Sequence, residues 1–136
     1  WGSGGTLKQI CRENGFDSTL LGIDIQHAGK MFLDLNEEGL LERISSHEGK
    51  ILLLLSPMGG QGFLIGRGNL QLSPDVLRAI GTSNILGIAT PAKLLGLNEL
   101  RIDTGDENLD AEIRAKKYLK VLQGYRTTRV IRVAED

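Results

Sequence analysis

The chain has little of several residue types whose abundance points to a particular class of protein. It has one cysteine, Cys11, which cannot form an internal disulfide, and this favours a reducing, cytoplasmic setting. Its 16 basic and 17 acidic residues leave a net charge of −1, so the overall balance favours neither nucleic acid nor an anionic membrane as a partner. No apolar run approaches the roughly 18 residues of a membrane span, and the first residues lack the layout of a signal peptide. These absences predict a soluble protein in which any anion site is local.

The length and the start of the chain bear on domain organisation. A chain of 136 residues predicts one domain, residues 1–136, with a core of its own. The chain begins at Trp1 on a glycine turn, and the strand expected before such a turn is missing, so we expect the carboxyl-terminal domain of a longer protein. The 18 glycines are neither periodic nor of low complexity, and therefore indicate turns in an ordered fold.

Short apolar segments alternate with helical patterns along the chain. Helices are predicted over Thr6–Asn14, after the cap Asn36, from Ser73-Pro74 to Gly81, from Thr90-Pro91 to Leu95, and after a capping box from Thr104 to Glu107. Strands are predicted over Thr19–Ile25, Lys30–Leu35, Lys50–Ser56, Asn84–Thr90, Glu99–Asp103, Tyr118–Leu122 and Thr128–Val133.

The order of these elements predicts the fold class. The run KILLLLS is apolar without alternation, which favours a strand in the middle of a sheet. Strands that alternate with helices predict an α/β fold of three layers, with a mainly parallel sheet, helices on both faces and room for an antiparallel edge. Ligands of such sheets collect at the carboxyl ends of the strands, where the glycine-rich loops are expected.

The first candidate site is the turn formed by Gly2, Ser3, Gly4, Gly5 and Thr6, which opens a helix. Glycine amides and a helix N-terminus bind anions, and the two hydroxyl side chains can donate hydrogen bonds. A tight turn with Thr6 as the helix cap fits the same residues equally well.

The second candidate is SPMGGQGFLIGRGN, residues 56–69. Its first turn offers the amides of Gly59, Gly60, Gln61 and Gly62. Its second turn carries Asn69 and Arg67, whose planar guanidinium suits phosphate or carboxylate. The alternative is that the glycines only allow a crowded crossover, and that Arg67 pairs with a surface carboxylate.

Three further segments contain polar groups. Asp103 and Asp106 could face a ribose hydroxyl or Mg²⁺, although capping of a helix explains Asp106 better. Arg126, beside Tyr125, either binds an anion or lies in a hairpin turn. His27 and His47 have no partner at a metal-ligand spacing, so we assign them to no metal site, and no catalytic residue is assigned.

Several segments, in order and spacing, resemble the carboxyl-terminal region of the ATP-NAD kinase-like family. They are LLGIDI, SPMGGQGFLIGRGNLQLSPDVLRAIG, NILGIATPAKLLGL, LRIDTGDENLD and VLQGYR. The segment GSGGT is similar to the family's Gly-Pro-Gly-Thr-Thr element, with Ser3 in place of proline.

The resemblance implies phosphoryl transfer to NAD from ATP or polyphosphate, with Mg²⁺ on the phosphates. The family's Gly-Gly-Asp-Gly-Thr element, which supplies the acidic residue, is absent from this sequence. The resemblance therefore implies that a preceding domain supplies this group, and that the chain alone is inactive while it binds a nucleotide or phosphate ligand.

A second layout similarity, to ribose-5-phosphate isomerase and to sugar-phosphate-sensing repressor domains, implies a sensor that binds sugar phosphate or nucleotide without catalysis. The isomerases have a lysine before their glycine run, where this chain has Pro57-Met58. A structural domain that forms homo-oligomers is the third alternative.

Overall fold

The computed structural model of the chain describes residues 1–66, 70–124 and 127–135. Its central sheet has four strands in the order β3-β5-β7-β8. Strands β3 (Leu53–Leu55), β5 (Ile85–Ile88) and β7 (Tyr118–Gly124) are parallel, and β8 (Thr127–Arg132) pairs with β7 in the antiparallel direction. The predicted α/β class, with a mainly parallel sheet and an antiparallel edge, is confirmed.

Two small sheets lie beside the central one. Strands β1 (Ile25–His27) and β2 (Lys30–Phe32) form an antiparallel hairpin. Its turn is Ala28-Gly29, where both residues have positive φ angles, of 51° and 76°. Two such residues are typical of the tight turn whose twist matches that of the flanking strands. Strands β4 (Phe63–Ile65) and β6 (Arg101–Ile102) form a parallel pair.

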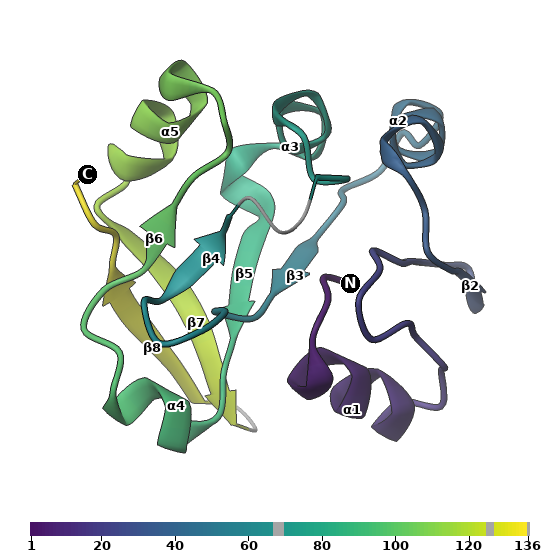
Figure 1. Cartoon of the computed structure of the whole chain (residues 1–136). Coiled ribbons are helices and arrows are strands. Elements are labelled where there is room, and N and C mark those ends of the chain that lie inside the picture. Colours follow the sequence, from purple (N-terminus) through teal and green to yellow (C-terminus); the bar gives the residue numbers. More distant parts are fainter. Residues whose placement is uncertain (67–69, 125–126, 136) are drawn as a thin grey trace.

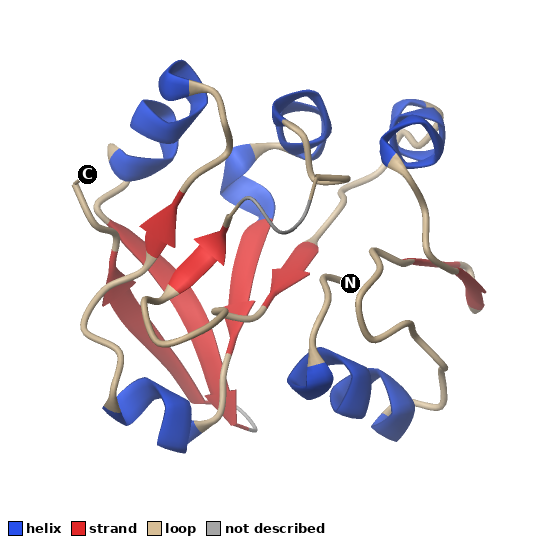
Figure 2. Cartoon of the chain, in the orientation of Figure 1, coloured by secondary structure: helices blue, strands red, loops and turns tan. Residues whose placement is uncertain are grey.

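Helices lie on both sides of the sheets (Figures 1 and 2). They are α1 (Gly5–Glu13), α2 (Glu37–Ser45), α3 (Pro74–Ile80), the short 3-10 helix η1 (Thr82–Asn84), α4 (Pro91–Leu95) and α5 (Glu107–Arg114). Helices α2, α3 and α5 follow one side of the molecule in Figure 1, and α1 and α4 follow the other. Within the described ranges, no helix has the length and apolar character needed to cross a membrane.

Three predicted caps are confirmed. The side chains of Asn36, Ser73 and Thr90 accept hydrogen bonds from the amides of Gly39, Val76 and Lys93, respectively. Each side chain satisfies one of the first-turn amides that have no partner within a helix.

Capping by Asp106, which the sequence favoured, is also confirmed, whereas two other residues that the sequence offered as caps, Thr6 and Thr104, do not cap their helices. Helix α1 begins after Gly4, which has no side-chain cap, so Thr6 lies inside the first turn. Helix α5 is capped by Asp106, which accepts hydrogen bonds from the amides of Asn108 and Leu109. Thr104 does not cap α5, because its hydroxyl donates instead to Asp110, 2.5 Å away.

The predicted position of the apolar strand is also wrong. Strand β3 is the outer strand of the four-stranded sheet. Leu53 and Leu55 are buried, whereas Leu52 is 53% exposed. Apolar sequence predicted burial correctly for these two leucines, but strand order depends on partners that are distant in the sequence.

One connected cluster of buried side chains joins the elements. It runs from Ile23, Leu40 and Ile44 in the first third of the chain to Ile131 and Val133 near its end. Helices α2 and α3 pack against each other, and both contribute side chains to it. The cluster fixes the loops at the strand ends relative to one another.

Candidate functional site

The first glycine of the N-terminal turn packs against strand β3. The amide of Gly2 donates to the carbonyl of Leu54, with an N to O distance of 2.8 Å. A Cβ atom on Gly2 would lie 2.7 Å from the Leu55 side chain and 2.9 Å from that same carbonyl oxygen. Only glycine fits this approach without a shift of β3, so Gly2 has a structural reason to be there.

The other residues of this turn leave the start of α1 open. Gly4 precedes the helix with a φ of 117°. A Cβ on Gly4 or Gly5 would meet no atom within 4 Å, and the first turn contains no acidic residue. The first turn therefore carries no acidic side chain at the positive end of the helix dipole, and an anion is the ligand such an end attracts.

The loop of Gly59–Gly62, which we call the glycine loop, follows β3. It is closed by the amide of Met58, which donates to the carbonyl of Phe63 at 2.7 Å. Gly59 and Gly62 have positive φ angles, of 65° and 77°. A Cβ on Gly59 or Gly60 would enter open space, whereas one on Gly62 would lie 2.6 Å from the carbonyl oxygen of Glu99. Gly59 and Gly60 therefore face outward, and Gly62 packs inward.

Lys93 lies beside the glycine loop, and sequence reasoning missed it. It belongs to α4, which starts at the carboxyl end of β5, and its ammonium donates to the carbonyl of Pro57. The parallel pairing of β3 and β5 brings these two strand ends together. A lysine within a helix directly after the neighbouring parallel strand is the signal that could have identified it.

Gly66 lies at the other end of β4 from the glycine loop. The glycine loop precedes this strand and Gly66 follows it, so they are separated by on the order of 10 Å of strand. The amide of Asp103 donates to the carbonyl of Ile65, which places Asp103 beside Gly66. The structure therefore does not bring Asp103 and Asp106 to the glycine loop. Arg67, Asn69 and Arg126 lie outside the described residues.

The acidic turn before α5 is held by its own hydrogen bonds. Asp106 caps the helix and forms an ion pair with Arg78, with an N to O distance of 3.0 Å. The hydrogen bond from the Leu109 amide and that from Arg78 lower the pKa of Asp106. The carboxylate of Asp110 accepts from both the amide and the hydroxyl of Thr104. These two carboxylates therefore accept hydrogen bonds from donors of their own turn and from Arg78.

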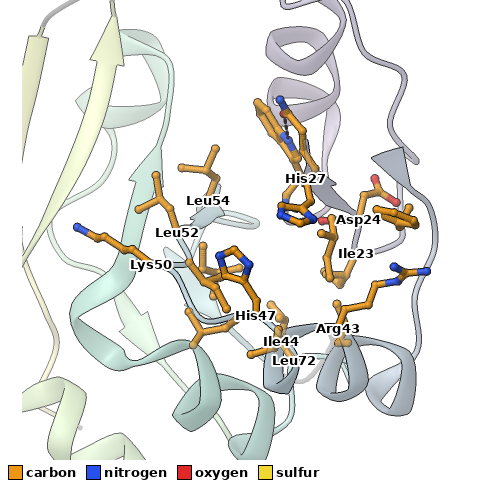
Figure 3. Close-up of a pocket in the computed structure, with 18 of the residues that line it drawn as sticks. Ile23, Asp24, His27, Arg43, Ile44, His47, Lys50, Leu52, Leu54 and Leu72 are labelled. Atoms are coloured by element: carbon orange, nitrogen blue, oxygen red, sulfur yellow. Dashed lines mark hydrogen bonds between the residues drawn. The ribbon is translucent and has the colours of Figure 1, made fainter. Parts of the chain in front are cut away.

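A pocket of about 390 Å³ lies elsewhere, between β3 and the β1–β2 hairpin (Figure 3). Its walls are mainly apolar, and His27, His47, Arg43 and Lys50 add polar groups. The two histidine rings are in edge-to-face contact, with centroids 5.1 Å apart, so the fold brings together two residues that are distant in the sequence. Within the described part of the chain, no group of three metal-ligating side chains exists.

Asp24 is the best-buried carboxylate near this pocket. It is 1% exposed and accepts hydrogen bonds from the amides of Thr19 and Asp34, both at 2.8 Å. The α-amino group of Trp1 donates to the Asp24 carbonyl at 2.8 Å. Burial lowers the pKa of this amine, although the Asp24 carboxylate opposes the shift. Asp24 organises the chain around it, and its oxygens are occupied.

The fold is that of an open α/β domain with a mainly parallel sheet, in which strand-to-helix loops lie at the carboxyl ends of the strands. A family model described as the ATP-NAD kinase C-terminal domain matches residues 2–133, so the chain belongs to that family. This confirms the family resemblance read from the sequence. No curated protein and no solved structure matches the chain.

Proposed function

We propose that this domain provides a phosphate- or nucleotide-binding surface for an NAD kinase that uses ATP or polyphosphate. The surface is formed by residues 2–6 at the start of α1 and by the glycine loop, with Lys93 as its cation. The observation that carries the proposal is the open helix start. The N-cap residue of α1 is Gly4, which makes no side-chain cap hydrogen bond, the first turn contains no acidic residue, and Gly4 and Gly5 leave space around its amides. A phosphate oxygen satisfies such amides well.

The glycine loop and Lys93 support the same chemistry. Gly59 and Gly60 leave the loop backbone accessible, and the Lys93 ammonium is fixed at the loop by the Pro57 carbonyl. An ammonium has donors to spare after one such hydrogen bond, and can also attract a phosphate. These groups bind and orient a ligand, whereas none of them is a general base for a hydroxyl group.

In the proposed reaction, the terminal phosphoryl group of ATP moves to a hydroxyl group of NAD, and ADP leaves. The proton of that hydroxyl requires an acceptor, and the carboxylates of Asp24, Asp106 and Asp110 are already hydrogen-bonded within the domain. We therefore expect a preceding domain to supply the acceptor, and this chain alone to bind without transferring phosphate. A cytoplasmic setting is part of the same proposal.

Thermal shift with ATP, NAD, polyphosphate and ribose 5-phosphate tests the binding surface. A ligand at 100 times its Kd stabilises the folded state by about 2.7 kcal/mol. We expect ATP, NAD or polyphosphate to raise the midpoint. A shift with ribose 5-phosphate alone would favour the sugar-phosphate sensor, and no shift with any ligand would contradict binding by this domain.

The variant Gly5→Asp makes this test specific. An aspartate in the first turn interacts favourably with the helix dipole, so the free protein should remain stable. The same carboxylate repels a phosphate at this turn, and should abolish the ligand-dependent shift. Gly5→Ser is the matched control, because it adds a side chain without charge. An unchanged ATP shift in Gly5→Asp would rule out the start of α1 as the binding site.

A further inference from the structure

The pocket beside β3, which we call the strand slot, is bounded by the edges of two strands. Strand β3 has β5 on one side only, and β1 has β2 on one side only. The pocket lies between their other edges, with Leu52 and Leu54 on one wall and His27 on the other (Figure 3). Trp1 also lines it, so the start of the described chain lies at this slot.

The backbone of Trp1 and Gly2 already forms strand-like hydrogen bonds across the slot. Trp1 exchanges two bonds with Asp24: its nitrogen donates to the Asp24 carbonyl at 2.8 Å, and the Asp24 amide donates to its carbonyl at 3.1 Å. On the other side, the amide of Gly2 donates to the carbonyl of Leu54 on β3, at 2.8 Å. Bonds that alternate between two sides are the pattern of a strand with a neighbour on each side.

We propose that the strand slot is filled by a β-strand formed from the residues that precede Trp1 in the longer protein. This strand runs antiparallel to β1 and parallel to β3. It joins the hairpin to the central sheet, in the order β2-β1-new strand-β3-β5-β7-β8. The proposal rests on the family's description as a C-terminal domain, and is independent of any nucleotide site.

The free edges have hydrogen-bonding groups at the required positions. In the β1–β2 hairpin, His27 and Lys30 flank the two-residue turn and form its closing pair. In an antiparallel pair, successive residues alternate between bonding to the partner strand and pointing their backbone N–H and C=O groups away from it. The backbone groups of Gln26 therefore point away from β2, toward the slot. On β3, the carbonyl of Leu54 faces the slot, so by the same alternation the backbone of Leu52 faces it as well.

The residues along β3 also fit an inner strand better than an outer one. Residues 51–55 are all apolar, and Leu52 is 53% exposed. Outer strands usually carry charge, proline or a bulge that discourages pairing with another chain. An inserted strand would cover Leu52 and Leu54, and would make β3 the inner strand that its sequence predicts.

Hydrogen exchange on an extended protein tests this proposal without any nucleotide. The chain is prepared with the roughly six native residues that precede Trp1, since strands of this length are common. A second protein carries a Gly-Ser extension of the same length. With the native extension, we expect the amides of Leu52, Leu54 and Gln26 to exchange up to about tenfold more slowly. The reason is that each amide acquires a carbonyl acceptor on the inserted strand.

The neighbouring amides are internal controls. Leu53 and Leu55 face β5, and His27 faces β2, so their exchange should change much less than that of the three slot-facing amides. Equal slowing at all of these positions would indicate general stabilisation and would overturn the proposal. Slowing with both extensions would show that the native residues are not required. Slowing only at high protein concentration would indicate pairing between copies of the chain. Either result would overturn the proposal. Unchanged exchange at Leu52, Leu54 and Gln26 would show that the slot takes no strand from this segment.

Discussion

The Lys93 ammonium donates a hydrogen bond to the Pro57 carbonyl, and this bond ties helix α4 to the start of the glycine loop. Replacing Lys93 with methionine keeps the aliphatic part of the side chain and removes the donor. Because Lys93 is exposed, we expect a loss of about 1 kcal/mol of stability or less. The larger effects should be faster amide exchange in Gly59–Gly62 and a weaker thermal shift with ATP.

The control for this variant is Lys116→Met, which removes the same charge from an exposed residue after α5. If both variants weaken the ATP shift equally, the effect is one of net charge, and Lys93 has no particular place in the binding surface. A normal ATP shift in Lys93→Met would also remove Lys93 from the proposal.

Two glycines of the same loop should respond in opposite ways to alanine. Gly62→Ala places a Cβ against the Glu99 carbonyl and the Leu97 side chain, at a φ of 77°. We expect it to lose at least about 1 to 2 kcal/mol, the cost of a left-handed conformation. Gly60→Ala enters open space at an ordinary φ, and should change stability by no more than about 1 kcal/mol in either direction. Chemical denaturation measures both, and similar losses would contradict the packing described for Gly62.

Local signals predicted much of the fold. The caps Asn36, Ser73 and Thr90 were correct because a cap depends on residues three positions apart. Thr104 resembled a cap, but Asp106 lies closer to the helix and its carboxylate accepts two amides, so Asp106 took that position. Where two capping residues compete, spacing alone does not decide between them.

Contacts between distant segments could not be predicted from the sequence. His27 and His47 are separated by β2 and α2, and only the fold brings their rings together. Lys93 and Pro57 meet because β3 and β5 are adjacent, and strand order is not encoded in the local pattern. The glycine loop and Asp103 were both candidate binding segments, but they lie at opposite ends of β4. The sequence therefore indicated residue types for a site more reliably than their arrangement.

The carboxylate of Asp24 should be important for stability. Asp24→Asn keeps the shape but replaces one acceptor oxygen with an N–H₂ group, which then faces an amide or a hydroxyl donor. A buried group without a partner costs about 1 to 3 kcal/mol, and we expect a loss in that range. The exposed residue Asp17 provides the control, since Asp17→Asn should have little effect. Equal stability of the two variants in urea would show that the hydrogen bonds of Asp24 are dispensable.

In a protein prepared with Trp1 as its first residue, the α-amino group of Trp1 predicts how stability depends on pH. Burial lowers its pKa in the folded state below the ordinary value of 8.0. Between the two pKa values the unfolded state binds more protons than the folded state, so the free energy of unfolding should rise as pH increases through this window toward 8. N-terminal acetylation removes the charge, and should both flatten this rise and increase stability at the lower end of the window. Urea denaturation at several pH values measures the slope for each form. If the acetylated and free chains have the same slope, another group causes the pH dependence and the Trp1 amine is not buried at a cost.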